Sequence, residues 1–60
     1  NYLYHAALGD FYVKRQAFME ARSAYNMALE LAQLPAERKV VEGKVAAIPG
    51  EGTKKEGYFP

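Results

Sequence analysis

Two helical stripes that follow each other within about thirty residues constrain this chain more than any other feature. The first stripe places apolar residues at i, i+3, i+4, i+7 and i+8, namely Tyr4, Ala7, Leu8, Phe11 and Tyr12. The second stripe has the same period and comprises Phe18, Ala21, Tyr25, Ala28, Leu29 and Ala32. A change of phase near Gln16–Ala17 separates the stripes, so the pattern predicts one helix over residues 3–15 and a second over 17–34.

Pro35 marks the boundary between the second helix and a third. Proline disfavours helical geometry in the residue before it, yet it is well tolerated in the first turn of a helix. Val41, Val45 and Ile48 form a shorter apolar stripe after it, and Pro49-Gly50 ends that stripe. The sequence therefore predicts a third helix over residues 35–48.

The predicted fold is all-α. Residues 1–48 are expected to form a helical hairpin with a third, capping helix, and residues 49–60, rich in glycine and charge, a flexible tail. Sixty residues allow one small domain with a limited core. Because the chain begins at Asn1 rather than at methionine, we expect it to be part of a longer protein.

Small residues in the hairpin predict where its helices touch. Two helices pack closely only where the facing side chains are small, so Gly9 and Ala21 are expected to be the contact points of the hairpin. Ala28 is expected to face the third helix. Large residues are expected to fill the space around these contacts: Leu8, Tyr12, Tyr25 and Leu29.

Composition excludes several classes of function. Eight basic and seven acidic residues give a net charge of +1, whereas a nucleic-acid or membrane-surface binder needs a basic face. No apolar run approaches the roughly 18 residues of a membrane span. The absence of cysteine rules out disulfides and is typical of a cytoplasmic protein. We therefore expect contacts with protein, with no direct nucleic-acid contact and no membrane.

No constellation of residues predicts catalysis, a metal site or a cofactor. His5 is the only histidine, and Asp10 lies roughly 140° away from it around a helix, so Asp10 does not orient it. A metal site needs three or four ligands, which the chain does not bring together. The carboxylates are scattered over polar faces, and no pair has the spacing of a nucleophile and its base. An enzyme is the least favoured hypothesis.

The spacing of small and large residues resembles that of one tetratricopeptide repeat, a helix–turn–helix unit of about 34 residues. The positions that match are Leu8-Gly9, Tyr12, Ala21, Tyr25 and Ala28-Leu29. Two positions depart from that pattern. The family's early large aromatic residue falls on His5, and its proline falls on Gln33, two residues before Pro35. The second departure predicts either a longer second helix or a different turn.

The tetratricopeptide resemblance also implies a surface that binds partners. Residues of the first helix line the groove of such arrays, and here these are Leu3, Ala6, Asp10, Val13 and Lys14. Val13 is apolar and lies off the main stripe, which favours a contact there. The alternative is that this face packs on a preceding repeat. Met19 and Met27 are expected to pack in the core or at its edge.

Five segments narrow the resemblance further. They are Tyr2-Leu3-Tyr4-His5-Ala6-Ala7, Gly9-Asp10, Ala21-Arg22-Ser23-Ala24-Tyr25, Ala28-Leu29-Glu30-Leu31-Ala32 and Pro35-Ala36-Glu37-Arg38-Lys39. Their order resembles the C-terminal part of bacterial extracytoplasmic-function-type sigma factors, which carry a tetratricopeptide-like extension after their DNA-binding regions. The resemblance covers Tyr2–Ile48, with Gly43 standing where the family more often has a charged or polar helix former.

The sigma-factor resemblance implies a regulatory, non-catalytic module in a cytoplasmic bacterial protein that directs RNA polymerase to promoters. Its partners would be the rest of the parent chain, RNA polymerase or a regulator. The alternative is a generic adaptor repeat from an unrelated multiprotein assembly. Because a lone repeat leaves an apolar side open, we expect the isolated chain to self-associate.

Overall fold

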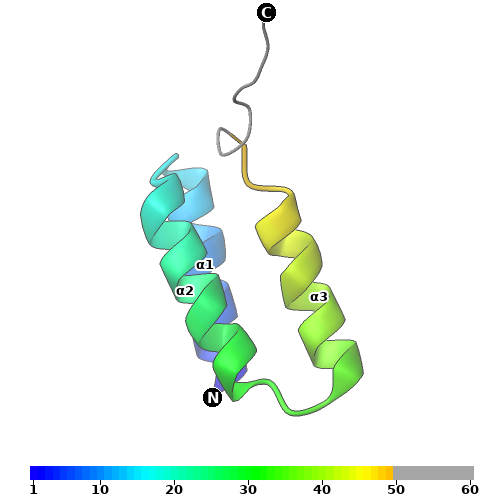
Figure 1. Ribbon diagram of the computed structural model, residues 1–60. Helices are drawn as coiled ribbons and strands as arrows, with labels where there is room; N and C mark the ends of the chain where they lie inside the picture. The colour runs from blue at the N-terminus through cyan, green and yellow to red at the C-terminus, as the bar shows by residue number, and fades with distance from the viewer. Residues whose placement is uncertain (50–60) are drawn as a thin grey trace, which may run out of the picture.

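Three helices account for most of the chain in the computed structural model, which describes residues 1–49. They are α1 (Tyr2–Lys14), α2 (Phe18–Leu31) and α3 (Pro35–Ala46). The chain runs up α1, down α2 and up α3, so each helix is antiparallel to the next (Figure 1). The predicted all-α fold with three helices is confirmed, whereas the predicted tail falls on residues 50–60, outside the described part, except for Pro49.

Helix α1 has well-formed ends. At its start the side-chain oxygen of Asn1 accepts hydrogen bonds from the backbone N–H groups of Leu3 and Tyr4, at 2.8 and 3.2 Å. These bonds satisfy two of the donors that every helix leaves unpaired at its N-terminus. At the other end the backbone of Gln16 turns to a φ of 62°. The predicted break at residues 16–17 is confirmed.

The turn after α1 is a Schellman motif. The backbone N–H of Ala17 bonds to the carbonyl of Tyr12 and that of Gln16 to the carbonyl of Val13, both at 2.9 Å. Such a motif requires a left-handed residue, which glycine usually supplies, and here Gln16 takes that conformation. This explains why no glycine or proline marked the turn in the sequence.

Helix α2 is shorter than predicted. It ends at Leu31 rather than at residue 34, because Ala32 and Leu34 are extended, with ψ of 131° and 142°. Pro35 imposes the extended geometry on Leu34. The late proline therefore reflects a different turn and not a longer helix. Helix α3 also ends two residues before its predicted limit, at Ala46.

Side chains of α3 hold the turn that precedes it. A carboxylate oxygen of Glu37 accepts hydrogen bonds from the backbone N–H groups of Gln33 and Leu34, at 3.1 and 3.2 Å. The guanidinium of Arg38 donates to the carbonyl of Leu29 at 2.8 Å. This bond occupies a carbonyl in the last turn of α2, where cations are favoured by the helix dipole.

The core is built mainly from small side chains around one tyrosine and two aliphatic residues. Its buried members are Ala6, Ala21, Tyr25, Ala28, Val41 and Ile48. Phe18, Leu29 and Val45 are partly buried and pack against this cluster. The predicted stripes of α2 and α3 thus lie at the core. Alanines keep the helices close, so the core carries few large apolar groups.

The stripe predicted for α1 is rotated relative to the face that the structure buries. Tyr4, Ala7 and Phe11 belong to the predicted apolar stripe, but 64% of the surface of Tyr4 and 52% of that of Phe11 are exposed, and Ala7 is exposed as well. The buried face of α1 contains Ala6 and Gly9 instead. Small residues allow the close approach of α2, which the bulky aromatic residues would prevent.

Candidate interaction surface

The five residues predicted to bind a partner do not form one exposed face. Leu3 and Lys14 are exposed, but Ala6 is buried in the core, and Asp10 and Val13 are half-buried. Burial removes Ala6 from any open surface, and Asp10 and Val13 are less exposed than expected, while partner binding by the four residues other than Ala6 stays a prediction. The physical reason is the rotation of α1, which turns these positions towards α2 and α3.

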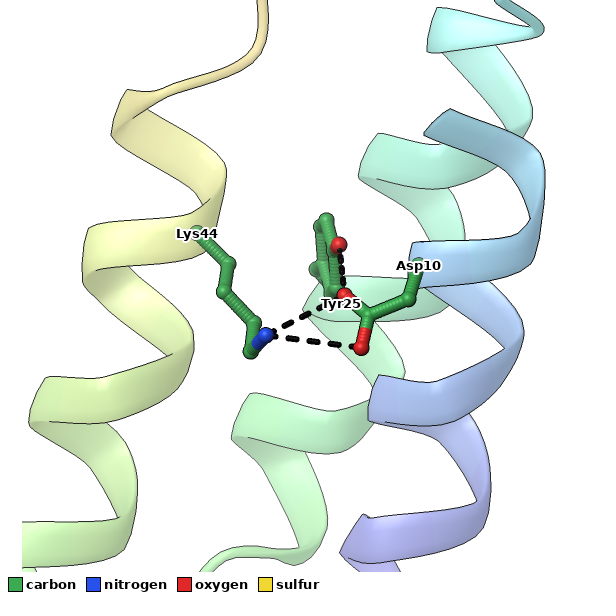
Figure 2. A network of polar contacts seen from close by, with 3 residues as sticks. All are labelled: Asp10, Tyr25 and Lys44. Carbon is green, nitrogen blue, oxygen red and sulfur yellow. Dashed lines mark hydrogen bonds and ion pairs between the residues drawn. The ribbon is translucent and has the colours of Figure 1, made fainter. Parts of the chain in front are cut away.

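Asp10 is instead the centre of a polar network that joins all three helices. The hydroxyl of Tyr25 on α2 donates to Oδ1 of Asp10 at 2.5 Å. The Nζ of Lys44 on α3 lies 3.2 Å from Oδ1 and 3.4 Å from Oδ2 (Figure 2). The three side chains converge between the helices, so this network helps to fix α3 on the hairpin.

The network shifts the titration of two of its members. Partial burial opposes ionisation of Asp10, but the hydrogen bond from Tyr25, the hydrogen bond and charge of Lys44, and the charge of Lys14 outweigh it. The pKa of Asp10 therefore lies below its ordinary value of 3.8. Burial, the hydrogen bond to Asp10 and the charge of Asp10 all raise the pKa of Tyr25 above its ordinary 10.0.

This network has the character of a structural clamp. Its carboxylate is ionised and already held by two donors, and its phenol is nearly fully buried, with 2% of its surface exposed. A small cavity of about 200 Å³ lies beside it. Ala47 and Ile48, at the end of α3, also line that cavity. A general base needs a free lone pair within reach of a substrate. Oδ1 of Asp10 already accepts hydrogen bonds from Tyr25 and Lys44, so this oxygen is not free to accept a proton from a substrate.

A second hollow lies between α1 and α2 and receives no residue from α3. It is a groove of about 260 Å³. Its lining comprises His5, Leu8, Tyr12, Glu20, Ser23, Ala24 and Met27. Tyr4 packs edge-on against His5, with ring centroids 5.0 Å apart, and Phe11 packs edge-on against Tyr12 at 5.6 Å. The exposed aromatic rings of α1 are therefore continuous with the groove.

We call this continuous surface the open α1–α2 face and define it by Tyr4, Leu8, Phe11, Tyr12 and Met27. Met27 is 44% exposed, and Leu8 and Tyr12 are half-buried. These side chains give the face a largely apolar surface.

Two opposite charges lie at one end of the open α1–α2 face. The guanidinium of Arg15 lies 5.5 Å from the centroid of the Phe11 ring, and Glu20 lines the groove. Within residues 1–49 the ion pairs are Arg38–Glu42 and Asp10–Lys44, so neither Arg15 nor Glu20 has an ionic partner there.

The apolar stripe of α1 was visible in the sequence, but the position of its aromatic residues outside the core was not. The spacing within this stripe carries one further signal. Tyr4, Leu8, Phe11 and Arg15 are spaced by four, three and four residues, and so are Glu20, Ala24, Met27 and Leu31. Alternating spacings of three and four are typical of helices that pack on a partner helix.

Residues 1–49 contain no group of three or more His, Cys, Asp and Glu side chains placed to hold a metal ion. His5 is half-buried against the edge of Tyr4. Over the same residues, no helix has the length and apolar character needed to cross a membrane.

Comparison of the chain with family models finds no match, and comparisons with curated proteins and with solved structures find none either. Residues 1–49 define a small all-α helical unit with an open apolar face between α1 and α2.

Proposed function

We propose that this chain is a non-catalytic protein-interaction module that binds its partner through the open α1–α2 face. The observation that carries the proposal is the exposure of two aromatic side chains, Tyr4 and Phe11, beside a groove that α3 leaves uncovered. Aromatic residues in a central pocket are the usual anchors of protein interfaces, because they bury a large area at a low entropic cost.

We further propose that the module is the C-terminal, tetratricopeptide-like extension of a bacterial extracytoplasmic-function-type sigma factor. The resemblance over Tyr2–Ile48 supports this setting. The close packing of α1 and α2 through small residues is compatible with it, as is the position of α3 beside α2. In that setting the module regulates transcription through protein contacts in the cytoplasm, and other regions of the sigma factor bind promoter DNA.

A binding experiment with purified components tests both parts. The immobilised chain is challenged separately with the two polymerase- and promoter-binding domains of an extracytoplasmic-function-type sigma factor and with RNA polymerase core enzyme. The same measurement is repeated with Phe11→Ser and with Val40→Ser. Phe11 and Val40 have similar exposures, 52% and 58%, but Val40 lies on α3 away from the open face, which makes it the matched control.

Saturable binding that Phe11→Ser weakens and Val40→Ser leaves unchanged would support the proposal. Binding to neither the sigma-factor domains nor the core enzyme would overturn the sigma-factor setting. Equal effects of the two variants would remove the open α1–α2 face as the binding surface. Circular dichroism of each variant checks that the helices remain folded.

A further inference from the structure

We propose that the open α1–α2 face binds a second copy of this chain, so that two hairpins form a four-helix bundle with α3 on the outside of each. This inference rests on the proposed function, because it uses the same face. It identifies a second copy of the chain as the partner that this face binds when no other protein is present. Four observations support it: the spacing of the residues on the face, its charges, the directions of the helices and its apolar area.

The spacing suits a bundle of helices. The residues that flank the groove recur at alternating intervals of four and three on both α1 and α2, as in Tyr4, Leu8 and Phe11. This repeat places one side chain per turn towards a partner helix over the whole length of the contact. The groove floor contains Ala24, a small residue that lets a facing helix approach.

The charges select one arrangement of the two copies. A two-fold axis parallel to the helices places α1 of each copy over α2 of the other, with the two interhelix turns at the same end. Arg15, at the C-terminal end of α1, then lies opposite Glu20 of the second copy, in the first turn of α2. The symmetry forms this pair twice, and both residues lack an ionic partner within residues 1–49.

Helix direction favours the same arrangement. Because α1 and α2 run in opposite directions within one copy, the two-fold axis makes every helix of the four antiparallel to both of its neighbours. The macrodipoles are then opposed across the interface as well as within each hairpin. A net charge of only +1 per chain adds little repulsion between copies.

The apolar area is sufficient for the centre of a dimer interface. An aromatic side chain contributes roughly 150–250 Å², so Tyr4 and Phe11, at 64% and 52% exposure, present about 175–290 Å² together. Leu8, Tyr12 and Met27 add to this patch. A standard interface buries about 800 Å² on each partner, with an apolar core and a polar rim. Glu20, Ser23 and the other polar side chains beside the groove supply that rim.

Sedimentation equilibrium of the purified chain over a range of concentrations provides the first test. The expected result is a reversible dimer of twice 6.7 kDa. Phe11→Ser is expected to weaken dimerisation by about tenfold, because it removes a central aromatic anchor, whereas Val40→Ser leaves it unchanged. A chain that remains monomeric at every concentration would overturn the proposal, and so would equal effects of the two variants.

Charge reversal tests the arrangement. Arg15→Glu and Glu20→Arg are each expected to weaken the dimer several-fold, because each places like charges opposite one another twice. The double variant Arg15→Glu/Glu20→Arg is expected to restore the affinity. An affinity that stays low in the double variant would overturn the two-fold arrangement. Circular dichroism checks that all three variants remain helical.

The outcomes also separate this inference from the proposed function. If the chain is monomeric but still binds sigma-factor domains through Phe11, the proposed dimer is wrong and the proposed protein-interaction function stands. A dimer that binds neither sigma-factor domains nor polymerase would support the second copy and overturn the sigma-factor setting.

Discussion

The ring of Tyr25 lies directly against the backbone of Gly9, where any larger residue would have its side chain. A Cβ atom built on Gly9 would lie 2.5 Å from Cδ1 and 2.8 Å from Cζ of that ring. Gly9 is therefore the site at which α2 inserts its largest core side chain into the surface of α1. The same ring continues to a hydroxyl that bonds to Asp10, so one tyrosine fixes both the spacing and the rotation of the hairpin.

We predict that Gly9→Ala destabilises the fold although alanine favours helices. Alanine gains about 1 kcal/mol over glycine in a helix interior. Here its methyl group would overlap a ring that is almost completely buried, and overpacking of this kind costs about 1–3 kcal/mol. The overlap outweighs the gain, so the urea midpoint of unfolding is expected to fall.

Gly43 provides the matched control for this substitution. It lies in α3, and a Cβ there would meet no atom within 4 Å. Gly43→Ala is therefore expected to raise the free energy of unfolding by about 1 kcal/mol. A stabilising Gly9→Ala would contradict the close contact between Gly9 and Tyr25.

The hydroxyl of Tyr25 is predicted to contribute to stability separately from its ring. Tyr25→Phe keeps the ring against Gly9 and removes only the donor to Asp10. A hydrogen bond to a charged group contributes about 1.5–3 kcal/mol, and the lower part of this range is expected because Lys44 still holds Asp10. A double-mutant cycle with Asp10→Ala, measured by urea unfolding, isolates the coupling of the pair. A coupling energy of zero would show that the two groups do not interact.

The same network predicts how stability depends on pH. The pKa of Asp10 is lowered by folding, so its contribution is present above the ordinary value of 3.8 and is lost as the pH falls through the folded value. The pKa of Tyr25 is raised, so its contribution is present below 10.0 and is lost as the pH rises above it. Because 48% of the Asp10 side chain is exposed, solvent screening keeps the acid effect small.

Urea titrations at a series of pH values check both limbs of this dependence. In Asp10→Asn the acid limb is expected to become flatter, because the substituted side chain does not titrate. In Tyr25→Phe the alkaline limb is expected to become flatter for the same reason. Variants with the slopes of the original chain on both limbs would show that other groups control the pH dependence.

The helices themselves were predictable from apolar period and from proline, because both act locally. Pro35 favours a helix start through its own backbone geometry, and α3 begins at this residue. The rotation of α1 was not predictable in the same way. Its sequence is apolar almost all round, with Tyr4 and Phe11 on one side and Ala6 and Val13 on the other. Side-chain volume determines which side of α1 is buried. The ring of Tyr25 fits against the side with small residues and would collide with the large residues on the other side.

The candidate site was misplaced for the same reason. The tetratricopeptide resemblance implied that Asp10 lines an open groove of the first helix. The partners of Asp10 come from 15 and 34 residues further along the chain. Such distant pairs leave no periodic signal in a single sequence. The open α1–α2 face follows from the same rotation, since the aromatic residues excluded from the core had to lie outside it.

The left-handed turn at Gln16 gives the last prediction. Its φ of 62° is unfavourable for a residue with a side chain, by about 1 kcal/mol relative to glycine. Both hydrogen bonds of the turn are made by backbone atoms, at Ala17 and Gln16, so they persist when the side chain is removed. Gln16→Gly is therefore expected to raise the thermal midpoint of unfolding, whereas Gln16→Ala, which keeps a Cβ, gives no gain. Equal midpoints for the two variants would show that the turn carries no strain. A higher midpoint for glycine alone would show that the left-handed conformation at this turn costs stability in the original chain.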